Sequence, residues 1–218
     1  MRQIDESEIK GYLLSGENRT VEYKPDFSWS DSTSLKAKEE TIKTIIALSN
    51  TPKGGVVVLG VSHIQDKDGK RHEFAGVSKK NLNWFLKNDE LVQQAVHAFC
   101  SVPADFEITF GSAVLKKGSE PIDFIIIIVK EFSVSPIITI KNSSSKDDTG
   151  TKGCIIKENE IYARSFSAIW SSKKCGHREL EDIIKLAADK HRADLKSRGY
   201  VKLDSLKSKL EKERAIYE

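Results

Sequence analysis

The chain has 218 residues, and its 35 basic and 32 acidic side chains leave a net charge of only +3. This near balance excludes a histone-like polycation and confines any nucleic-acid-binding surface to a local patch. Hydrophobic residues make up 39% of the chain, enough for a folded core, and its longest unbroken apolar run covers only residues 124–129. A membrane-spanning helix needs about 20 apolar residues, so that class of protein is excluded too.

The cysteines and the N-terminus bear on the cellular setting. Cys100, Cys154 and Cys175 form no CxxC pair, which argues against a zinc ribbon or a disulfide scaffold. The first ten residues, MRQIDESEIK, lack the apolar core of a signal peptide. We therefore expect a reduced, cytoplasmic protein.

The first part of the chain predicts a helix, a strand, a polar loop, a second helix and a fully apolar strand, over residues 5–14, 20–24, 26–36, 38–49 and 56–61. The second helix joins the apolar strand through Asn50-Thr51-Pro52-Lys53-Gly54-Gly55. This connection is either a loop that lets backbone approach a phosphate or a tight helix-to-strand turn. We favour the turn, because the glycines precede the strand, whereas a phosphate-binding loop follows one.

The second part of the chain predicts a turn, a helix, three antiparallel strands, a strand that extends the sheet, a last hairpin and two charged helices. These elements cover residues 66–70, 79–98, 105–110, 112–116, 122–129, 137–140, 155–166, 178–198 and 202–218. The hairpin pairs residues 155–156 with 160–166. The fold class is therefore α/β (α+β), with a mixed, largely antiparallel sheet flanked by helices and a C-terminal helical extension.

The distribution of charge along the chain supports a domain boundary shortly after the predicted sheet. Residues 171–218 contain 13 basic and 9 acidic side chains, so the excess positive charge of the chain lies there. We divide the chain into a domain over residues 1–177 and a charged helical extension over residues 178–218. Because these helices have few apolar positions, they would need a partner to be stable.

One strand carries candidate catalytic residues. In Glu22-Tyr23-Lys24, the first and third side chains share a face, because residues two apart on a strand point the same way. A carboxylate and a lysine at this spacing occur in metal-dependent nucleases, where the carboxylate holds a divalent ion and the lysine orients water. Glu17 lies five residues upstream and would add a second carboxylate. The alternative is an ion pair on a solvated strand face.

These segments resemble a known family. The order ENRTVEYK, IIALSNT and GGVVVLGV, followed by FIIIIVKEFSVSPI and EIYARSFSAIWSSKKCGHRELEDI, is similar to the AlbA-type DNA-binding domain of Schlafen-related proteins, once called divergent AAA. The resemblance runs from about Ile9 to Ile184. It implies a mixed α/β domain that binds DNA or RNA.

The resemblance also implies an enzymatic alternative. Some Schlafen proteins cut structured RNA such as tRNA with three carboxylates and a divalent metal, Mg²⁺ or Mn²⁺. Two of these carboxylates would be Glu17 and Glu22, with Lys24 beside them. The third, an aspartate after the apolar strand, is absent, since the sequence there reads Val61-Ser62-His63-Ile64. His63 completes the expected metal ligands, although imidazole suits transition metals better than magnesium.

Cationic side chains near the end of the domain are candidates for phosphate contact. These are Arg164, Lys173, Lys174 and Arg178, with Lys24 reaching a phosphate from the strand. The alternative is that they form a solvated face.

Three functions remain open at this stage. We expect first a non-catalytic or regulatory nucleic-acid-binding protein whose partner is DNA or a tRNA-like RNA. A metal-dependent endoribonuclease is the second candidate. The third is an interaction or oligomerisation subunit that assembles through its C-terminal helices.

Overall fold

The computed structural model describes residues 1–66, 69–145, 154–166 and 172–198. Its main sheet has five strands in the order β1-β6-β7-β3-β2, with bounds Arg2–Gln3, Phe106–Ala113, Ile122–Val129, Gly55–Leu59 and Val21–Lys24. Strands β6, β7 and β3 pair antiparallel, while β1 and β2 run parallel to their neighbours. The predicted mixed α+β architecture is confirmed.

Side-chain alternation divides the sheet into two buried faces. Val57 and Ile127 belong to one hydrophobic cluster, whereas Val58 and Ile126 belong to the other. Strands covered on both faces have continuous apolar sequences, as the central strands do here. Strand β2 follows the same alternation, and this places Tyr23 on the second face.

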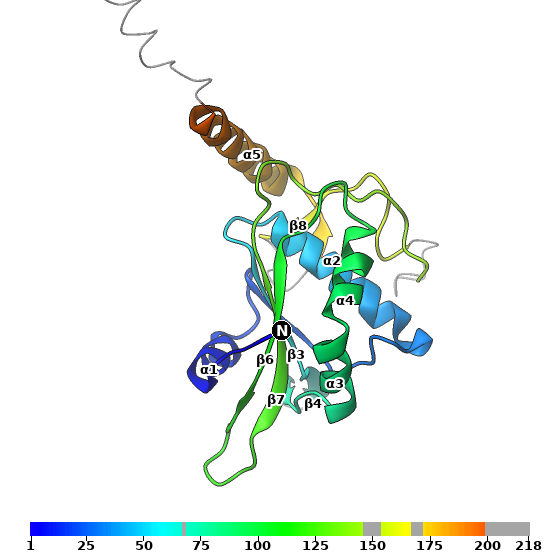
Figure 1. Cartoon of the computed structure of the whole chain (residues 1–218), viewed down its shortest axis with the longest axis vertical. Coiled ribbons are helices and arrows are strands. Elements are labelled where there is room, and N and C mark those ends of the chain that lie inside the picture. The colour runs from blue at the N-terminus through cyan, green and yellow to red at the C-terminus, as the bar shows by residue number, and fades with distance from the viewer. Residues whose placement is uncertain (67–68, 146–153, 167–171, 199–218) are drawn as a thin grey trace, which may run out of the picture.

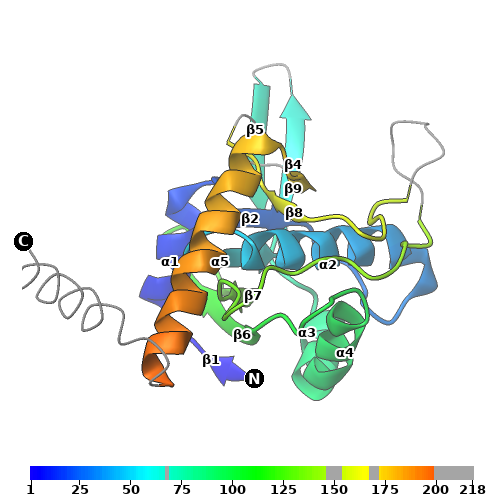
Figure 2. The same cartoon turned by 90° about the horizontal axis from the view of Figure 1, so that it is seen from above.

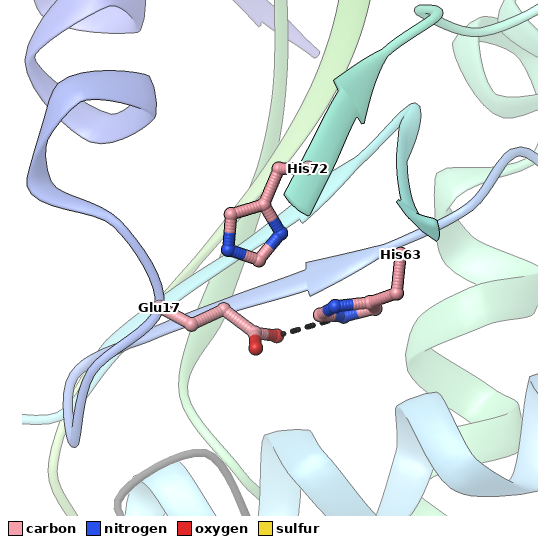
Figure 3. A group of neighbouring side chains, drawn as sticks. All are labelled: Glu17, His63 and His72. Carbon is pink, nitrogen blue, oxygen red and sulfur yellow. Dashed lines mark ion pairs between the residues drawn. The ribbon is translucent and has the colours of Figure 1, made fainter. Parts of the chain in front are cut away.

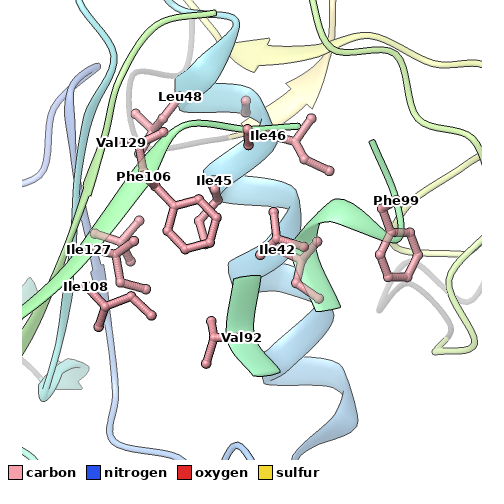
Figure 4. Packing of buried hydrophobic residues seen from close by; sticks show 14 of the residues in the cluster. Ile42, Ile45, Ile46, Leu48, Val92, Phe99, Phe106, Ile108, Ile127 and Val129 are labelled. Carbon is pink, nitrogen blue, oxygen red and sulfur yellow. The ribbon is translucent and has the colours of Figure 1, made fainter. Parts of the chain in front are cut away.

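Helices cover both faces (Figures 1 and 2). Helix α2 (Leu35–Ser49) lies on the first face, with α3 (Lys79–Lys87) and α4 (Asp89–His97) beside it, and α1 (Glu6–Ser15) covers the second. Figure 4 shows Ile42 and Ile45 of α2 in the same cluster as the sheet residues Phe106, Ile108 and Ile127, with Ile45 beside Phe106. A short 3-10 turn, η1 (Ser32–Ser34), precedes α2.

Two expected elements in the middle of the chain differ. The single helix expected over 79–98 is two helices, α3 and α4, that meet at Asn88. The strands expected over 105–110 and 112–116 are instead one strand, β6, that ends at Ala113. The turn expected at 66–70 includes residues 67–68, which lie outside the described residues; β4 (Val61–Asp66) and β5 (Gly69–Phe74) pair antiparallel and form a sheet of their own.

The last part of the domain corrects two more expectations. Strand β8 (Tyr162–Arg164) pairs with β9 (Ser172–Lys174), not with residues 155–156. Residues 137–140 do not extend the sheet, since Thr139 makes only an isolated bridge with Cys100. Strand β8 lies against α2, whose buried Asn50 cap donates to the carbonyl oxygens of Ile137 and Tyr162.

Helix α5 (His177–Ser197) begins close to the expected residue 178. It packs through Ile183 against Phe132 and Ala163, and Lys190 pairs with Glu131 at 2.8 Å. The helix expected over 202–218 lies outside the described residues, and the domain boundary at 177/178 stays a prediction. No helix within the described ranges is long and apolar enough to span a membrane.

Candidate nucleic-acid and metal-binding sites

Three charged side chains, two of them buried, join β2 to β8. The Glu22 side chain is only 6% exposed, and Arg164 Nη1 donates to its Oε2 at 2.5 Å. Lys24 Nζ lies 2.8 Å from the other oxygen, Oε1. Arg164 also donates through Nη2 to the carbonyl oxygen of Asn18 at 2.8 Å. Both oxygens of the Glu22 carboxylate therefore have a cationic partner, as a buried carboxylate requires.

This pairing affects two predicted roles, metal binding by Glu22 and phosphate contact by Arg164. A metal ion at Glu22 would have to displace Arg164 or Lys24 from a carboxylate that has little contact with water. Arg164 itself has no exposed side-chain surface, so a direct contact between its guanidinium and a phosphate does not fit the structure. The sequence contains no sign of this ion pair, because Glu22 lies 142 residues away from Arg164. Arg164 was therefore predicted to be a surface cation.

Glu17 lies in a different environment. It follows Gly16, whose φ of 65° ends α1, and its Oε1 accepts a hydrogen bond from the backbone N–H of Tyr23 at 3.0 Å. Strand β2 is the outermost strand of the sheet. The Glu17 carboxylate therefore accepts the hydrogen bond of a backbone N–H that no neighbouring strand of the sheet uses. Burial, reinforced by the negative charge of Glu17, raises the pKa of Tyr23 to about 12.

Two histidines lie beside Glu17, as Figure 3 shows. His63 Nε2 is 3.3 Å from Glu17 Oε1, and His63 faces His72 across the β4–β5 hairpin. Ligand atoms of Glu17, His63 and His72 all lie within 4.8 Å of one another, and Glu22 is not part of this group. The predicted neighbours Glu17 and His63 are thus close together, and His72, which the sequence analysis did not select, joins them.

These residues do not fit the three-carboxylate Mg²⁺ or Mn²⁺ site that the family resemblance implies. Magnesium prefers oxygen ligands, but two of the three side chains grouped here are imidazoles. The carboxylate of Glu22 is held by Arg164 and Lys24 instead.

A separate basic hollow lies between α2 and the β8–β9 hairpin. Its volume is about 510 Å³, and its lining includes four lysines: Lys43, Lys157, Lys173 and Lys174. Among its lining residues, Glu160 is the only carboxylate, and it accepts a hydrogen bond from Lys174 at 2.7 Å. We call this feature the lysine pocket. It brings the predicted phosphate ligands Lys173 and Lys174 together with two lysines that sequence reasoning missed.

Arg178 lies at the start of α5, outside the lysine pocket lining. Its guanidinium carbon is 5.0 Å from the ring centre of Phe166, and that of Arg19 is 3.6 Å from the same ring. Arg19 also pairs with Asp182 of α5 at 3.7 Å. Arg178 is exposed, while Arg19, which was not predicted, connects the segment just before β2 to α5.

Comparison with protein families identifies the family of this chain. The family described as "Schlafen, AlbA_2" matches residues 17–166, more than half of the chain. This chain belongs to the Schlafen AlbA_2 family. The match includes Glu17, Glu22, His63, His72 and Arg164, but ends before Lys173 and Lys174.

Solved structures show weaker similarity. The DIP2311 protein from Corynebacterium diphtheriae matches over 81% of this chain, at 14% identity and a TM-score of 0.43. This chain spans only 27% of that protein's chain. The N-terminal domain of an ATP-dependent DNA helicase RecG-related protein from Nitrosomonas europaea is 18% identical, with a TM-score of 0.39; the match covers 72% of this chain and 89% of that domain. No curated protein matches the sequence.

Proposed function

We propose that this Schlafen AlbA_2 domain binds nucleic acid, with the lysine pocket as the main contact for the phosphate backbone. The observation that carries the proposal is the convergence of four lysines on one hollow in a chain whose overall charge is close to neutral. Membership of the family supports it. Exposed Arg178 extends the positively charged surface to the start of α5.

The chemistry of the pocket suits a polyanion. Lysines that neutralise phosphates release condensed counterions, so their contribution falls as salt rises. Lys174 is 69% exposed, and an ion pair at such a position contributes little to stability. A phosphate can therefore replace Glu160 as its partner at small cost. Lys24, held by Glu22, would contribute only at the margin of the surface.

The test is fluorescence anisotropy with labelled duplex DNA, single-stranded DNA and tRNA over a series of salt concentrations. The double variant Lys173→Glu/Lys174→Glu should bind at least about 10-fold more weakly and with a shallower salt dependence, because it removes phosphate contacts. The three ligands distinguish DNA from RNA.

A matched control is available at the opposite end of the molecule. Lys116 and Lys117 are also adjacent and exposed, in the turn between β6 and β7, far from β8 in Figure 1. Lys116→Glu/Lys117→Glu changes the net charge by the same amount and should leave affinity nearly unchanged. Equal losses in the two variants, or no binding by the parent protein at low salt, would contradict the proposal.

The same preparations test RNA cleavage. A gel of tRNA incubated with the protein and Mg²⁺ or Mn²⁺ shows whether the RNA stays intact. Fragments formed by the parent protein and by Glu181→Gln, but not by Glu17→Gln, would favour the endoribonuclease alternative. Glu181 is a suitable control because it is an exposed carboxylate on α5.

A further inference from the structure

We propose that Glu17, His63 and His72 form a binding site for a transition-metal ion of the Zn²⁺ type, separate from both the lysine pocket and Glu22. The proposal is independent of nucleic-acid binding. Among the described residues, these three bring a carboxylate and two imidazoles within 4.8 Å of one another (Figure 3). One carboxylate with two histidines is a known ligand set for catalytic zinc.

The β4–β5 hairpin holds the two histidines together. His63 and His72 are directly opposite in the antiparallel register, so their side chains share one face. Their ring centres are 4.9 Å apart. Tyr23 packs edge-on against His72 at 4.9 Å, which restricts the orientation of that imidazole.

The spacing of the first two ligands already fits a metal ion. Glu17 Oε1 and His63 Nε2 are 3.3 Å apart. Two ligands of one tetrahedral zinc, each about 2.0–2.1 Å from the ion, are separated by about 3.3 Å. A ligand nitrogen of His72 lies within 4.8 Å of both atoms, so a small movement of this imidazole completes the three protein ligands.

The environment of His72 gives independent evidence for a ligand at this site. Its Nδ1 is buried and has no hydrogen-bond partner among the described residues. A buried polar atom without a partner is costly, and a bound ion supplies the absent interaction.

The surroundings support a metal in two further ways. The Tyr23 N–H that donates to Glu17 Oε1 orients the carboxylate, as groups beside metal ligands commonly do. His63 is 44% exposed, so an ion can enter from solvent and retain a water as fourth ligand. Two nitrogen donors favour zinc or another transition metal over magnesium.

The test uses the full chain after removal of metal with a chelator. Calorimetric titration with Zn²⁺ should give one site per chain, and Co²⁺ should produce the intense visible absorption of a tetrahedral site. His63→Ala and His72→Ala should each weaken Zn²⁺ binding at least about 10-fold. Addition of Mg²⁺ should not displace the Zn²⁺.

His177→Ala is the matched control, because His177 is exposed and also lies beside a glutamate, Glu181, at 3.4 Å. It should retain the site. Zn²⁺ should also raise the unfolding temperature of the parent protein and of His177→Ala, but not that of His63→Ala. Since His63 is exposed, its loss should leave the fold intact, which circular dichroism checks. Unchanged Zn²⁺ affinity in both His63→Ala and His72→Ala, or no binding by the parent protein, would overturn the proposal.

Discussion

Arg164 is fully buried, and the structure explains why an arginine is tolerated there. Its guanidinium bonds to Glu22 and to the Asn18 carbonyl oxygen, while Lys24 neutralises the second oxygen of Glu22. These contacts connect the edge strand β2 to β8, whose Arg164 lies 142 residues after Glu22 in the sequence. The ion pair between Glu22 and Arg164 therefore holds β8 in place. Because β9 pairs with β8, the same ion pair also positions the lysine pocket.

Replacing Arg164 with methionine should lower the free energy of unfolding by about 3–5 kcal/mol, because Glu22 would keep a buried charge without its main partner. Urea denaturation measures the loss. The double variant Glu22→Gln/Arg164→Met should recover part of it, since the buried charge is then gone.

Lys130→Met is the control for this substitution. Lys130 pairs with Asp105 at 3.1 Å, but both side chains are more than 60% exposed. Its loss should cost at most about 1 kcal/mol. Similar losses at positions 130 and 164 would show that the buried pair contributes no more than a surface pair.

The connection between α2 and β3 is the tight turn that the sequence favoured over a phosphate-binding loop. Gly54 has a φ of 66°, and a Cβ there would collide with the backbone carbonyl oxygen of Val129 on β7. Backbone, not a ligand, occupies the space beside this glycine. The turn lets β3 enter the sheet between β7 and β2 directly after the buried end of α2.

Gly54→Ala should destabilise the protein much more than Gly118→Ala. Both glycines have positive φ, so alanine costs about 1–2 kcal/mol at each from backbone strain. Only Gly54 adds a collision, since a Cβ at Gly118 meets nothing within 4 Å. Denaturation curves of the two variants measure the difference, and equal destabilisation would contradict the argument.

Two of the three cysteines, Cys100 and Cys175, lie in separate parts of the fold. Cys100 follows α4, and its Sγ donates to the Val96 carbonyl oxygen at 3.2 Å, whereas Cys175 packs with the small cluster beneath α5. Burial raises the pKa of Cys100 to about 12. Burial and then the charge of Glu179 raise the pKa of Cys175 to about 12.

Iodoacetamide should therefore modify neither Cys100 nor Cys175 at a noticeable rate near pH 8, because only the thiolate reacts. In urea both should react quickly, since an unfolded cysteine has a pKa of about 8.5. Mass spectrometry of the digested protein measures the two sites separately. Rapid labelling of Cys175 alone in native buffer would show that α5 detaches while the sheet stays folded.

Much of the fold could be predicted from sequence because it depends on local patterns. The apolar strand at 122–129 and the helix over 38–49 follow from periodicity, whereas the apolar run expected as one strand over 56–61 is divided at Gly60, since β3 ends at Leu59 and β4 begins at Val61. The glycine-containing segment DKDGK after His63 is typical of a hairpin turn and so favours an antiparallel partner strand that begins within a few residues, a signal that could have identified His72. The break at Asn88 and the pairing of β8 with β9 were missed, because several local arrangements fit those residues equally well.

The sequence by itself determined the family, the mixed architecture, and the presence of Glu17, Glu22, His63 and the paired lysines at recognisable positions. Only the tertiary structure decided how these residues are used. Glu22 forms an ion pair with Arg164, which is 142 residues away in the sequence, whereas Glu17 lies beside two histidines of the β4–β5 hairpin. A buried charge is stable only beside a compensating partner, and that partner is known only when distant segments are packed together.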